Sequence, residues 1–236
     1  MRYNHHISSI YRICQCKMKR SGFTKWLLGL TVLLTGAMEA DHRHTRFEHL
    51  TTRHGLSQIT VNCVAQDKRG FLWFGTQDGL NRFDGYGITR YLSDPNEGGK
   101  LSANYIWDLF EDSRGDFWIA TDGGGLNLYD RQLDRFVCFR HRKTDPGSIS
   151  HDSINTIYED QNHRLWIGTF LGLNRFDRST STFSHFFIPA NGDTGLQQNN
   201  IRSIVEQRPG ILWVGARNGL FQFNINRNQF DSYNYL

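Results

Sequence analysis

The sequence predicts an all-β fold built from four copies of one four-stranded unit, and three observations support this prediction. The first is a phrase that returns four times, as GFLWFGTQDGLNRFD, GDFWIATDGGGLNLYD, HRLWIGTFLGLNRFD and GILWVGARNGLFQFN. The second is the spacing of its central tryptophans, Trp73, Trp118, Trp166 and Trp213, which are 45, 48 and 47 residues apart. The third is that Gly, Asn and Asp interrupt the apolar stretches, as they do between short strands. Repeats of this length are typical of propellers and solenoids.

Each repeat opens with two aliphatic residues five positions apart. These pairs are Leu56 and Val61, Leu101 and Ile106, Ile149 and Ile154, and Leu196 and Ile201. The apolar and polar residues that follow predict an innermost strand, which ends at a turn. The turn begins with Asp67, Asp112, Asp160 or Gln207, and its fourth residue is Gly70, Gly115, His163 or Gly210. Asp at the first position can bond the downstream backbone and Gly at the fourth tolerates positive φ, so these turns are expected to close hairpins.

Three further strands complete each unit. The tryptophan strand carries large and β-branched residues that suit a pleated surface packed against a neighbouring sheet. A Gly-Leu step then opens a third strand that ends at Asp84, Asp130, Asp177 or Asn224. An outer strand with two apolar residues three apart follows, as at Phe136 and Phe139. Four strands at this period predict a β-propeller blade.

A period of 45 to 48 residues also fits two-helix repeats. The repeat region has no stretch with apolar residues at helical spacing over three turns, so the helical solenoid is disfavoured. Phe47 and Leu50 repeat the outer-strand pattern ahead of the first unit, yet the last unit is also complete through Tyr233. The strands predicted in this chain therefore do not match those needed for a closed ring. Either the chain is the first part of a longer protein, or its open blade edges cause self-association, or four blades close alone.

The sequence divides into a leader, a connecting segment and the repeats. The leader spans 1–40, the connecting segment with its outer strand spans 41–55, and the repeats span 56–100, 101–148, 149–195 and 196–236. Within the leader, basic residues precede a short apolar run, Trp26 to Leu34, and small residues follow, which predicts a secretory signal peptide with Met18 as its start. An uncleaved membrane anchor is the alternative. Both place the blades outside the cytoplasm, in the periplasm.

Charge limits the classes of partner that the chain is expected to bind, and cysteine placement indicates whether a disulfide can form. The formal charge is +4, but six Lys and Arg residues precede the apolar run, so the mature domain is close to neutral and no nucleic-acid partner is expected. Membrane attachment would come only from the uncleaved leader or from a downstream helix. Cys63 and Cys138 fall on inner and outer strands of neighbouring blades, too far apart for a disulfide, and are expected to be buried free thiols.

The search for catalytic chemistry is negative. Asp67, Asp112 and Asp160 are better explained as turn residues than as metal ligands, because equivalent turns lie far apart in a ring. The histidines at 42, 44, 49 and 54 are only a weak indication of metal binding, and they are better explained as part of an irregular segment. No zinc spacing, phosphate loop or G-x-S-x-G elbow occurs. The sequence therefore predicts no catalytic residue, no metal site and no cofactor.

A binding site is expected where loops converge on one face around the propeller axis. One set of loops enters the innermost strands, and the other joins the second strand to the third. The residues of these loops are Gln58, Asn104, Tyr105, Asp152 and Asn199, and Gln77, Asp78, Asp122, Phe170, Arg217 and Asn218. Such amides, carboxylates and aromatic rings can hold a small polar ligand such as an oligosaccharide. Because the sequence gives Asn104 no structural role, its replacement is expected to affect ligand binding rather than stability.

The recurring D-x-x-G-x-L-W-I-G-T and G-L-N-R-F-D cores resemble the two-component regulator propeller repeat. The resemblance covers Phe47 to the C-terminus, with Gln207, Ala216 and Phe221 as departures in the fourth copy. It implies a seven-bladed propeller in the periplasmic sensor region of a histidine kinase or diguanylate cyclase, with polysaccharide fragments as a common signal. This chain carries no kinase, cyclase or hydrolase motif. Ligand sensing is the leading functional hypothesis, and an exported protein-interaction propeller and a glycan-cleaving enzyme with Asp78 and Asp122 are the alternatives.

Overall fold

The computed structural model describes residues 49–94, 96–189, 199–217 and 219–232. The chain divides into two units, residues 1–46 and 47–236, and every described residue belongs to the second. The leader, in which a signal peptide is predicted, and Phe47 therefore lie outside the described residues. Leu50 lies in no strand, and a short 3-10 helix, η1 (Thr52–His54), follows it. No helix in the described ranges is long and apolar enough to span a membrane.

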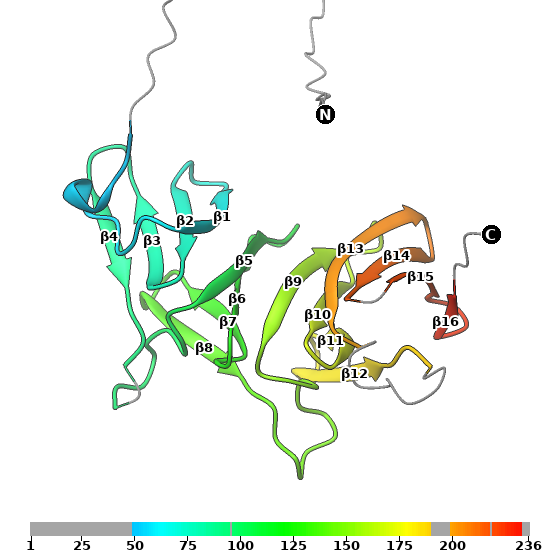
Figure 1. The fold of residues 1–236 in the computed structure, drawn as a ribbon. Helices are drawn as coiled ribbons and strands as arrows, with labels where there is room; N and C mark the ends of the chain where they lie inside the picture. Colours follow the sequence, from blue (N-terminus) through cyan, green and yellow to red (C-terminus); the bar gives the residue numbers. More distant parts are fainter. Residues whose placement is uncertain (1–48, 95, 190–198, 218, 233–236) are drawn as a thin grey trace, which may run out of the picture. The chain divides into compact units, whose positions relative to one another are not determined.

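Four antiparallel sheets of four strands follow one another along the chain, which confirms the predicted all-β propeller blades (Figure 1). The first blade has β1 (Val61–Gln66), β2 (Leu72–Thr76), β3 (Gly79–Phe83) and β4 (Ile88–Tyr91). The second has β5 (Ile106–Glu111), β6 (Phe117–Thr121), β7 (Leu126–Asp130) and β8 (Arg135–Phe139). The third has β9 (Ile154–Glu159), β10 (Leu165–Thr169), β11 (Gly172–Asp177) and β12 (Thr182–Phe186). The fourth has β13 (Ile201–Arg208), β14 (Ile211–Ala216), β15 (Gly219–Asn224) and β16 (Gln229–Ser232).

The innermost strands begin at the second aliphatic residue of each pair. The first aliphatic residue lies in the preceding loop, where Leu56, Leu101 and Ile149 are buried as loop anchors. Each innermost strand also contains a β-bulge near its start, for example between Ile106 and Asp108. A bulge inserts one residue into the alternation, and this explains why Ile106 and Leu109 face the same side at a spacing of three.

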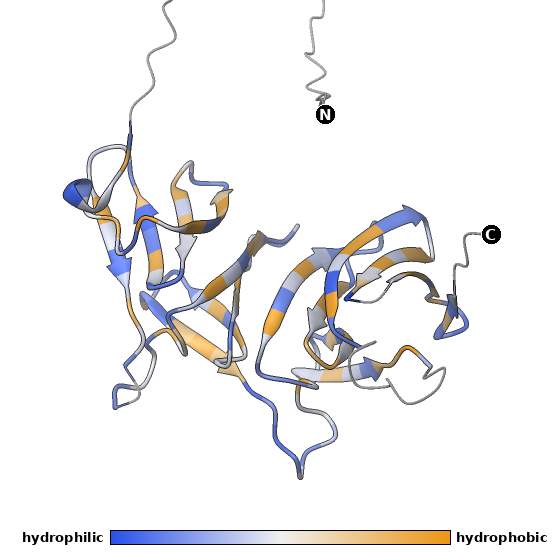
Figure 2. Cartoon of the chain, viewed as in Figure 1, coloured by the Kyte–Doolittle hydropathy of each residue, from blue (hydrophilic) through white to orange (hydrophobic). Residues whose placement is uncertain are grey.

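The hydrophobic core lies between blades rather than within one sheet. Each blade has a tryptophan face, which carries Trp73 and Leu80 in the first blade, and an aliphatic face, which carries Ile106 and Leu109 in the second. The tryptophan face of each of the first three blades packs against the aliphatic face of the next, in three separate clusters. Hydrophobic positions accordingly alternate along the strands in Figure 2. This repeated contact places equivalent loops of successive blades next to one another.

Candidate functional site

One end of the sheets carries the hairpin turns that follow the innermost strands, and its aspartates are structural. Asp67 Oδ1 accepts hydrogen bonds from the backbone N–H groups of Arg69 and Phe71, both at 3.0 Å. Its Oδ2 accepts from the indole Nε1–H of the buried Trp73 at 2.9 Å. Asp112 and Asp160 repeat the arrangement with Trp118 and Trp166. Each aspartate therefore closes its turn and also satisfies the one polar atom of the core tryptophan.

Arginines from the following blade complete two of these turns. Arg131, just after β7, donates to Asp67 Oδ2 at 2.7 Å and to Glu111 at 2.8 Å. Arg178, just after β11, pairs with Asp112 and Asp116 in the turn of the second blade, and its Nη2 lies 3.9 Å from Glu159 Oε1, the equivalent of Glu111. Burial would raise the pKa of Asp67, but hydrogen bonds from Arg131 and Trp73 outweigh burial and lower it. The pKa of Asp112 is lowered by the same balance of burial against hydrogen bonds, from its tryptophan and arginine.

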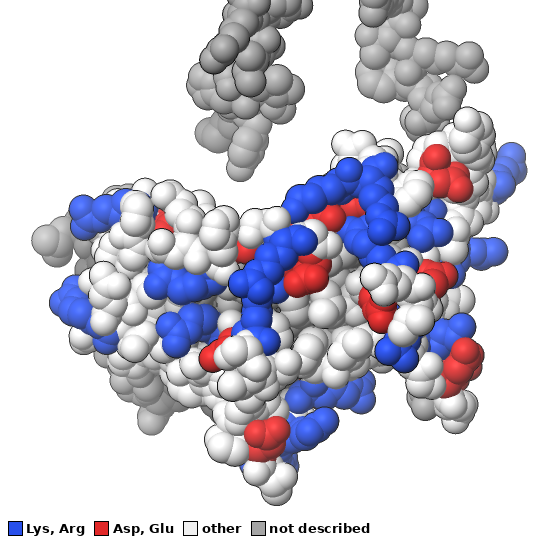
Figure 3. Space-filling view, turned by 180° about the vertical axis from the view of Figure 1, so that it is seen from behind, with Lys and Arg blue, Asp and Glu red and all other residues white. Residues whose placement is uncertain are grey.

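The turn of the third blade is completed differently. Ile225 of the fourth blade stands where Arg131 and Arg178 stand, and Asp160 is paired with Arg164 of its own turn at 2.6 Å. A second contact is kept in all three interfaces. The residue after the first turn position donates its backbone N–H to a glutamate at or near the end of the next blade's innermost strand. These pairs are Lys68 with Glu111, Ser113 with Glu159, and Gln161 with Glu206. Figure 3 shows basic side chains interspersed with acidic ones.

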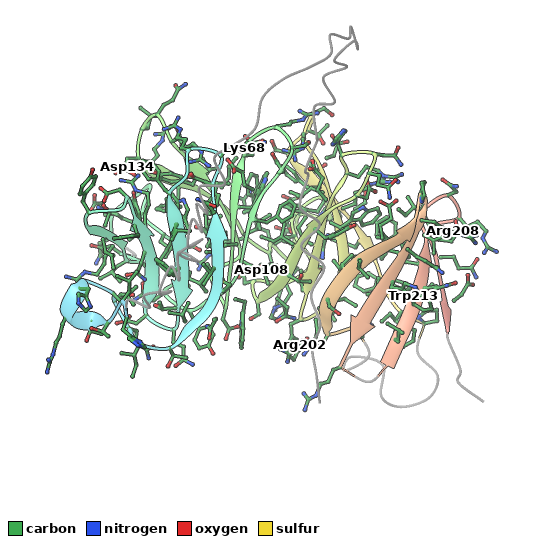
Figure 4. All side chains as sticks on the ribbon, turned by 90° about the horizontal axis from the view of Figure 1, so that it is seen from above. Lys68, Asp108, Asp134, Arg202, Arg208 and Trp213 are labelled. Atoms are coloured by element: carbon green, nitrogen blue, oxygen red, sulfur yellow. The ribbon has the colours of Figure 1, made fainter. Side chains whose placement is uncertain are left out.

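The other end of the sheets carries the loops predicted to bind a ligand. Figure 4 shows the two ends on β13, with Arg202 at one and Arg208 on the turn side. Three of the predicted residues have one structural role there. The side-chain oxygens of Asn104, Asp152 and Asn199 accept N–H bonds, each at 2.7 Å, from Ser93, His141 and Ile188.

The backbone carbonyls of the same three residues accept from Gly79, Gly125 and Gly172 of the preceding blade. Together these bonds fix the loop that carries the chain from one blade to the next. Replacement of Asn104 is therefore expected to lower stability as well as any ligand affinity, and the sequence-based expectation for this residue is revised.

The junction of the first two blades brings four predicted residues together. Asn104 Nδ2 donates to Asp78 Oδ1 at 3.1 Å, and Gln77 Nε2 donates to the Tyr105 hydroxyl at 3.4 Å. Gln77 and Asp78 are exposed, so their remaining hydrogen-bonding capacity faces solvent. Gln58 is nearer the first blade, where its side chain accepts from the backbone of Thr60. The junction is thus a polar surface with one phenol ring.

The remaining predicted residues belong to the later blades. The backbone N–H groups of Asp122, Phe170 and Arg217 donate to the loops entering the innermost strands of their own blades. All three side chains are exposed, whereas Asn218 lies outside the described residues. Asp122 is joined in this way to Tyr105 at the junction of the first two blades, with an N–O distance of 2.9 Å, whereas no described hydrogen bond joins Phe170 or Arg217 to that junction. The predicted residues therefore line one end of the sheets without forming one compact pocket in the described ranges.

Two aromatic pairs lie at this end, and in each pair the sequence predicted one residue, Tyr105 or Phe170, and missed the other. Tyr105 lies 4.8 Å from Trp107, and Phe170 lies 5.2 Å from His151, between ring centroids. Trp107 is the residue inserted by the β-bulge of β5, a position that the repeat pattern does not mark as special. Burial lowers the pKa of His151, which keeps the ring neutral at pH 7. These rings can stack on a flat ligand while neighbouring amides and carboxylates bond its edges.

Two clefts at the outer strands were not predicted. The larger, of about 520 Å³, lies between β4 and the turn before β8 and is lined by Tyr91, Lys100, Asp134 and Phe136, among others. At its edge Tyr91 and Tyr129 both donate to Asp134 Oδ1. The equivalent cleft of the next interface is about 260 Å³ and has Phe139 and Ser181 in place of Tyr91 and Asp134. Non-repeated residues of this kind carry no signal in a repeat pattern.

Both cysteines of the described region are free, at half-buried and exposed positions. Cys63 is half-buried and Cys138 is exposed, so the expectation that both thiols are buried is wrong for Cys138. Cys138 lies on an outer strand, where its Sγ contacts the Gly124 carbonyl oxygen at 3.1 Å. Burial raises the pKa of the Cys63 thiol to about 12, so this thiol stays protonated at pH 7. No group of metal-ligating side chains occurs within the described ranges.

Four-stranded sheets packed face to face, with polar loops gathered at one end, define the chain as a propeller-repeat protein. The model of the two component regulator propeller matches it four times, at residues 55–78, 100–123, 148–170 and 195–218. The chain therefore carries four two-component regulator propeller repeats. The matched model describes a propeller repeat, and no catalytic domain is evident in the described part of the chain.

Similar solved structures include extracellular domains of signalling proteins from B. thetaiotaomicron. One, from a putative hybrid two component system, has a TM-score of 0.71 and 25% identity over 80% of this chain and 26% of that chain. Another, from a putative one component system, has a TM-score of 0.61 and 26% identity over 73% of this chain and 25% of that chain. A histidine kinase of Formosa agariphila is 34% identical over 56% of this chain. The chain spans 17% of that kinase and about a quarter of each extracellular domain.

Proposed function

We propose that this chain is an extracytoplasmic ligand-sensing region of a two-component or other transmembrane signalling protein. The observation that carries the proposal is the fourfold match to the regulator propeller repeat, together with the likeness to extracellular domains of such systems. The predicted signal peptide supports the location outside the cytoplasm. The signalling output would belong to further domains of the kind that the histidine kinase relative carries.

The ligand would bind at the end of the sheets that carries Gln77, Asp78, Asp122, Phe170 and Arg217. These side chains are exposed, and aromatic pairs stand beside them. A small polar ligand such as an oligosaccharide suits this combination, because its hydroxyl groups bond amides and carboxylates while its ring faces stack on aromatic side chains. The turn end offers a poorer site, since its aspartates are already committed to tryptophans and arginines.

Calorimetric titration of the chain with a panel of neutral and acidic oligosaccharides tests this proposal. Arg217→Ala and Asp122→Ala are expected to weaken binding at least about fivefold, the loss of one hydrogen bond of about 1 kcal/mol. Arg114→Ala is the matched control, because Arg114 is also an exposed arginine but lies in a turn at the opposite end. Equal weakening by Arg217→Ala and Arg114→Ala would contradict the assigned end, and no binding by any member of the panel would contradict sugar sensing.

An exported protein-interaction propeller is the second candidate function. The observation that favours it is apolar exposure at the outer hairpin of the second blade, where Leu133 is 60% and Val137 is 43% exposed. Surfaces of this kind commonly mark protein contacts. A macromolecular partner retained by the chain in the absence of any small ligand would favour this alternative.

A further inference from the structure

In the third blade, a histidine connects two loops at the end of the sheets assigned to ligand binding. His151 lies in the loop that enters β9, and its ring Nδ1 accepts a hydrogen bond from the backbone N–H of Ser153 at 2.9 Å. The carbonyl oxygen of Ser153 accepts from the backbone N–H of Phe170 at 3.0 Å, in the loop between β10 and β11. The Phe170 ring also packs on the His151 ring, 5.2 Å away between centroids. These three contacts join the His151 ring to the backbone of both loops.

The bond from Ser153 requires a neutral histidine. A ring nitrogen that accepts a hydrogen bond carries no proton, so the proton of neutral His151 is on Nε2. A charged ring would turn an N–H group toward the N–H of Ser153, and the bond would be lost. The nearby His141 differs, because its Nδ1 contacts the carbonyl oxygen of Ile149 at 2.8 Å and must donate. Protonation therefore preserves the contact of His141 and breaks the contact of His151.

The surroundings of His151 favour the neutral ring. Burial has the largest influence and disfavours the charged form, and a protonated His141 would add to this effect. Asp152 of the same loop and Asp122 of the second blade favour the charge, but they do not outweigh burial, and the pKa of His151 is lowered from 6.5. The ring is therefore neutral at about pH 7 and takes up a proton only as the pH falls below 6.5.

The first blade makes the same bond with a group that does not titrate. Gln58 stands where His151 stands, two positions after the aliphatic residue that opens the repeat. Its Oε1 accepts from the backbone N–H of Thr60 at 2.7 Å, again two positions along the chain. The second blade has Ala103 at this position, whose side chain offers no acceptor. The blade fold therefore does not require a titratable group here, and the third blade has one.

We propose that His151 is a proton switch at the ligand-binding end of the third blade. The neutral ring ties the Ser153 backbone, and through it the loop of Phe170, into one fixed arrangement. Protonation in mild acid removes the Ser153 bond and leaves that backbone free to move. Because Phe170 is among the residues assigned to ligand binding, acid would also weaken binding. This last consequence rests on the proposed function, whereas the switch itself does not.

Nitrogen-15 NMR of the purified chain without ligand, from about pH 7.5 to 4.5, tests the switch. The Ser153 amide should titrate with the same midpoint as the His151 ring, and its protection against hydrogen exchange should fall about fivefold, as for one lost hydrogen bond. The Thr60 amide is the internal control and should not titrate, because its acceptor is the Gln58 amide. An unchanged Ser153 amide while the ring titrates, or a ring that stays neutral throughout, overturns the proposal. Because no ligand is present, either result would leave the sensing proposal standing.

His151→Gln is the matched variant, since it gives the third blade the acceptor that the first blade uses at Gln58. The Ser153 amide should stay protected across the whole pH range in this variant. His151→Ala, which copies Ala103, should lose that protection at every pH. His141→Gln should keep the titration, with its midpoint at the same or a slightly higher pH because a neighbouring positive charge is gone. A Ser153 amide that still titrates in His151→Gln would assign the switch to another group and overturn the proposal.

Discussion

A comparison of the first and fourth blades shows which contacts hold a blade against its neighbour. Both are terminal among the described blades, and each packs against one described neighbour, the first through its tryptophan face and the fourth through its aliphatic face. The first is additionally held by Arg131, which joins Asp67 to Glu111 across the interface. The fourth supplies Ile225 at that position, and Asp160 of its neighbour is neutralised within the third blade by Arg164. Apolar packing and the bond to the glutamate are therefore common to all three interfaces, and the arginine adds a directional, charge-dependent attachment to two of them.

The largest loss of stability is expected from a substitution in the apolar packing, which is present at every interface. Trp118→Ala removes a side chain that is fully buried between the second and third blades and leaves Asp112 without its indole partner. A loss of about 3 to 5 kcal/mol in the free energy of unfolding follows for a buried aromatic residue. Urea denaturation followed by intrinsic fluorescence measures it. A loss below about 1 kcal/mol would show that packing is not the shared foundation of these interfaces.

The next effect distinguishes the two interfaces that have an arginine paired across them from the third interface, which has none. Arg178→Ala leaves the buried Asp112 carboxylate without its cation, and a loss of about 2 to 3 kcal/mol is expected, below the full cost for a buried pair because Arg178 is partly exposed. The double variant Arg178→Ala with Asp112→Asn should recover part of that loss. If Arg178→Ala costs no more than an exposed surface change, the arginine does not hold the blades together.

Acid titration sharpens the same comparison. The folded-state pKa values of Asp67 and Asp112 lie below their ordinary value near about 3.9, so the stability they contribute is fully present above that pH. It is lost as the pH falls through the lowered folded-state values. The stability difference between wild type and Arg178→Ala should therefore shrink as the pH is lowered from about 5 toward 2. Denaturation curves at several pH values check this, and a constant difference would contradict the ionic origin of the attachment.

The smallest effect is expected at the third interface. Arg164→Ala also leaves a buried carboxylate, Asp160, without its cation, but Arg164 is more exposed than Arg178 and makes no ion pair between blades, so water can take its place and a smaller loss of about 1 kcal/mol is expected. Chemical denaturation beside Arg178→Ala gives a direct ranking of the two arginines. A larger loss for Arg164→Ala would reverse the proposed order of the interfaces.

Repetition explains which parts of this structure the sequence could predict. The sheets, their strand order and the hairpin turns were predictable because four copies show the same apolar and glycine positions. The Asp67 bond to Trp73 was missed, although both residues recur, because nothing in the spacing says that the two side chains meet. Arg131 and Asp67 lie 64 residues apart, and only the packing of one blade on the next brings them together. The loop role of Asn104 was missed for the same reason, since Ser93 belongs to the irregular connection.

Native-state hydrogen exchange, resolved by strand, tests the central claim most directly. Each of the two terminal described blades has one described neighbouring blade, but the two use opposite faces, so the change caused by Arg131→Ala is what isolates the arginine attachment. Amides of β2 in the first blade should exchange more slowly than the equivalent amides of β14 in the fourth, and Arg131→Ala should remove most of that difference. Equal protection of β2 and β14 in the wild-type chain, or an unchanged difference in Arg131→Ala, would contradict the account.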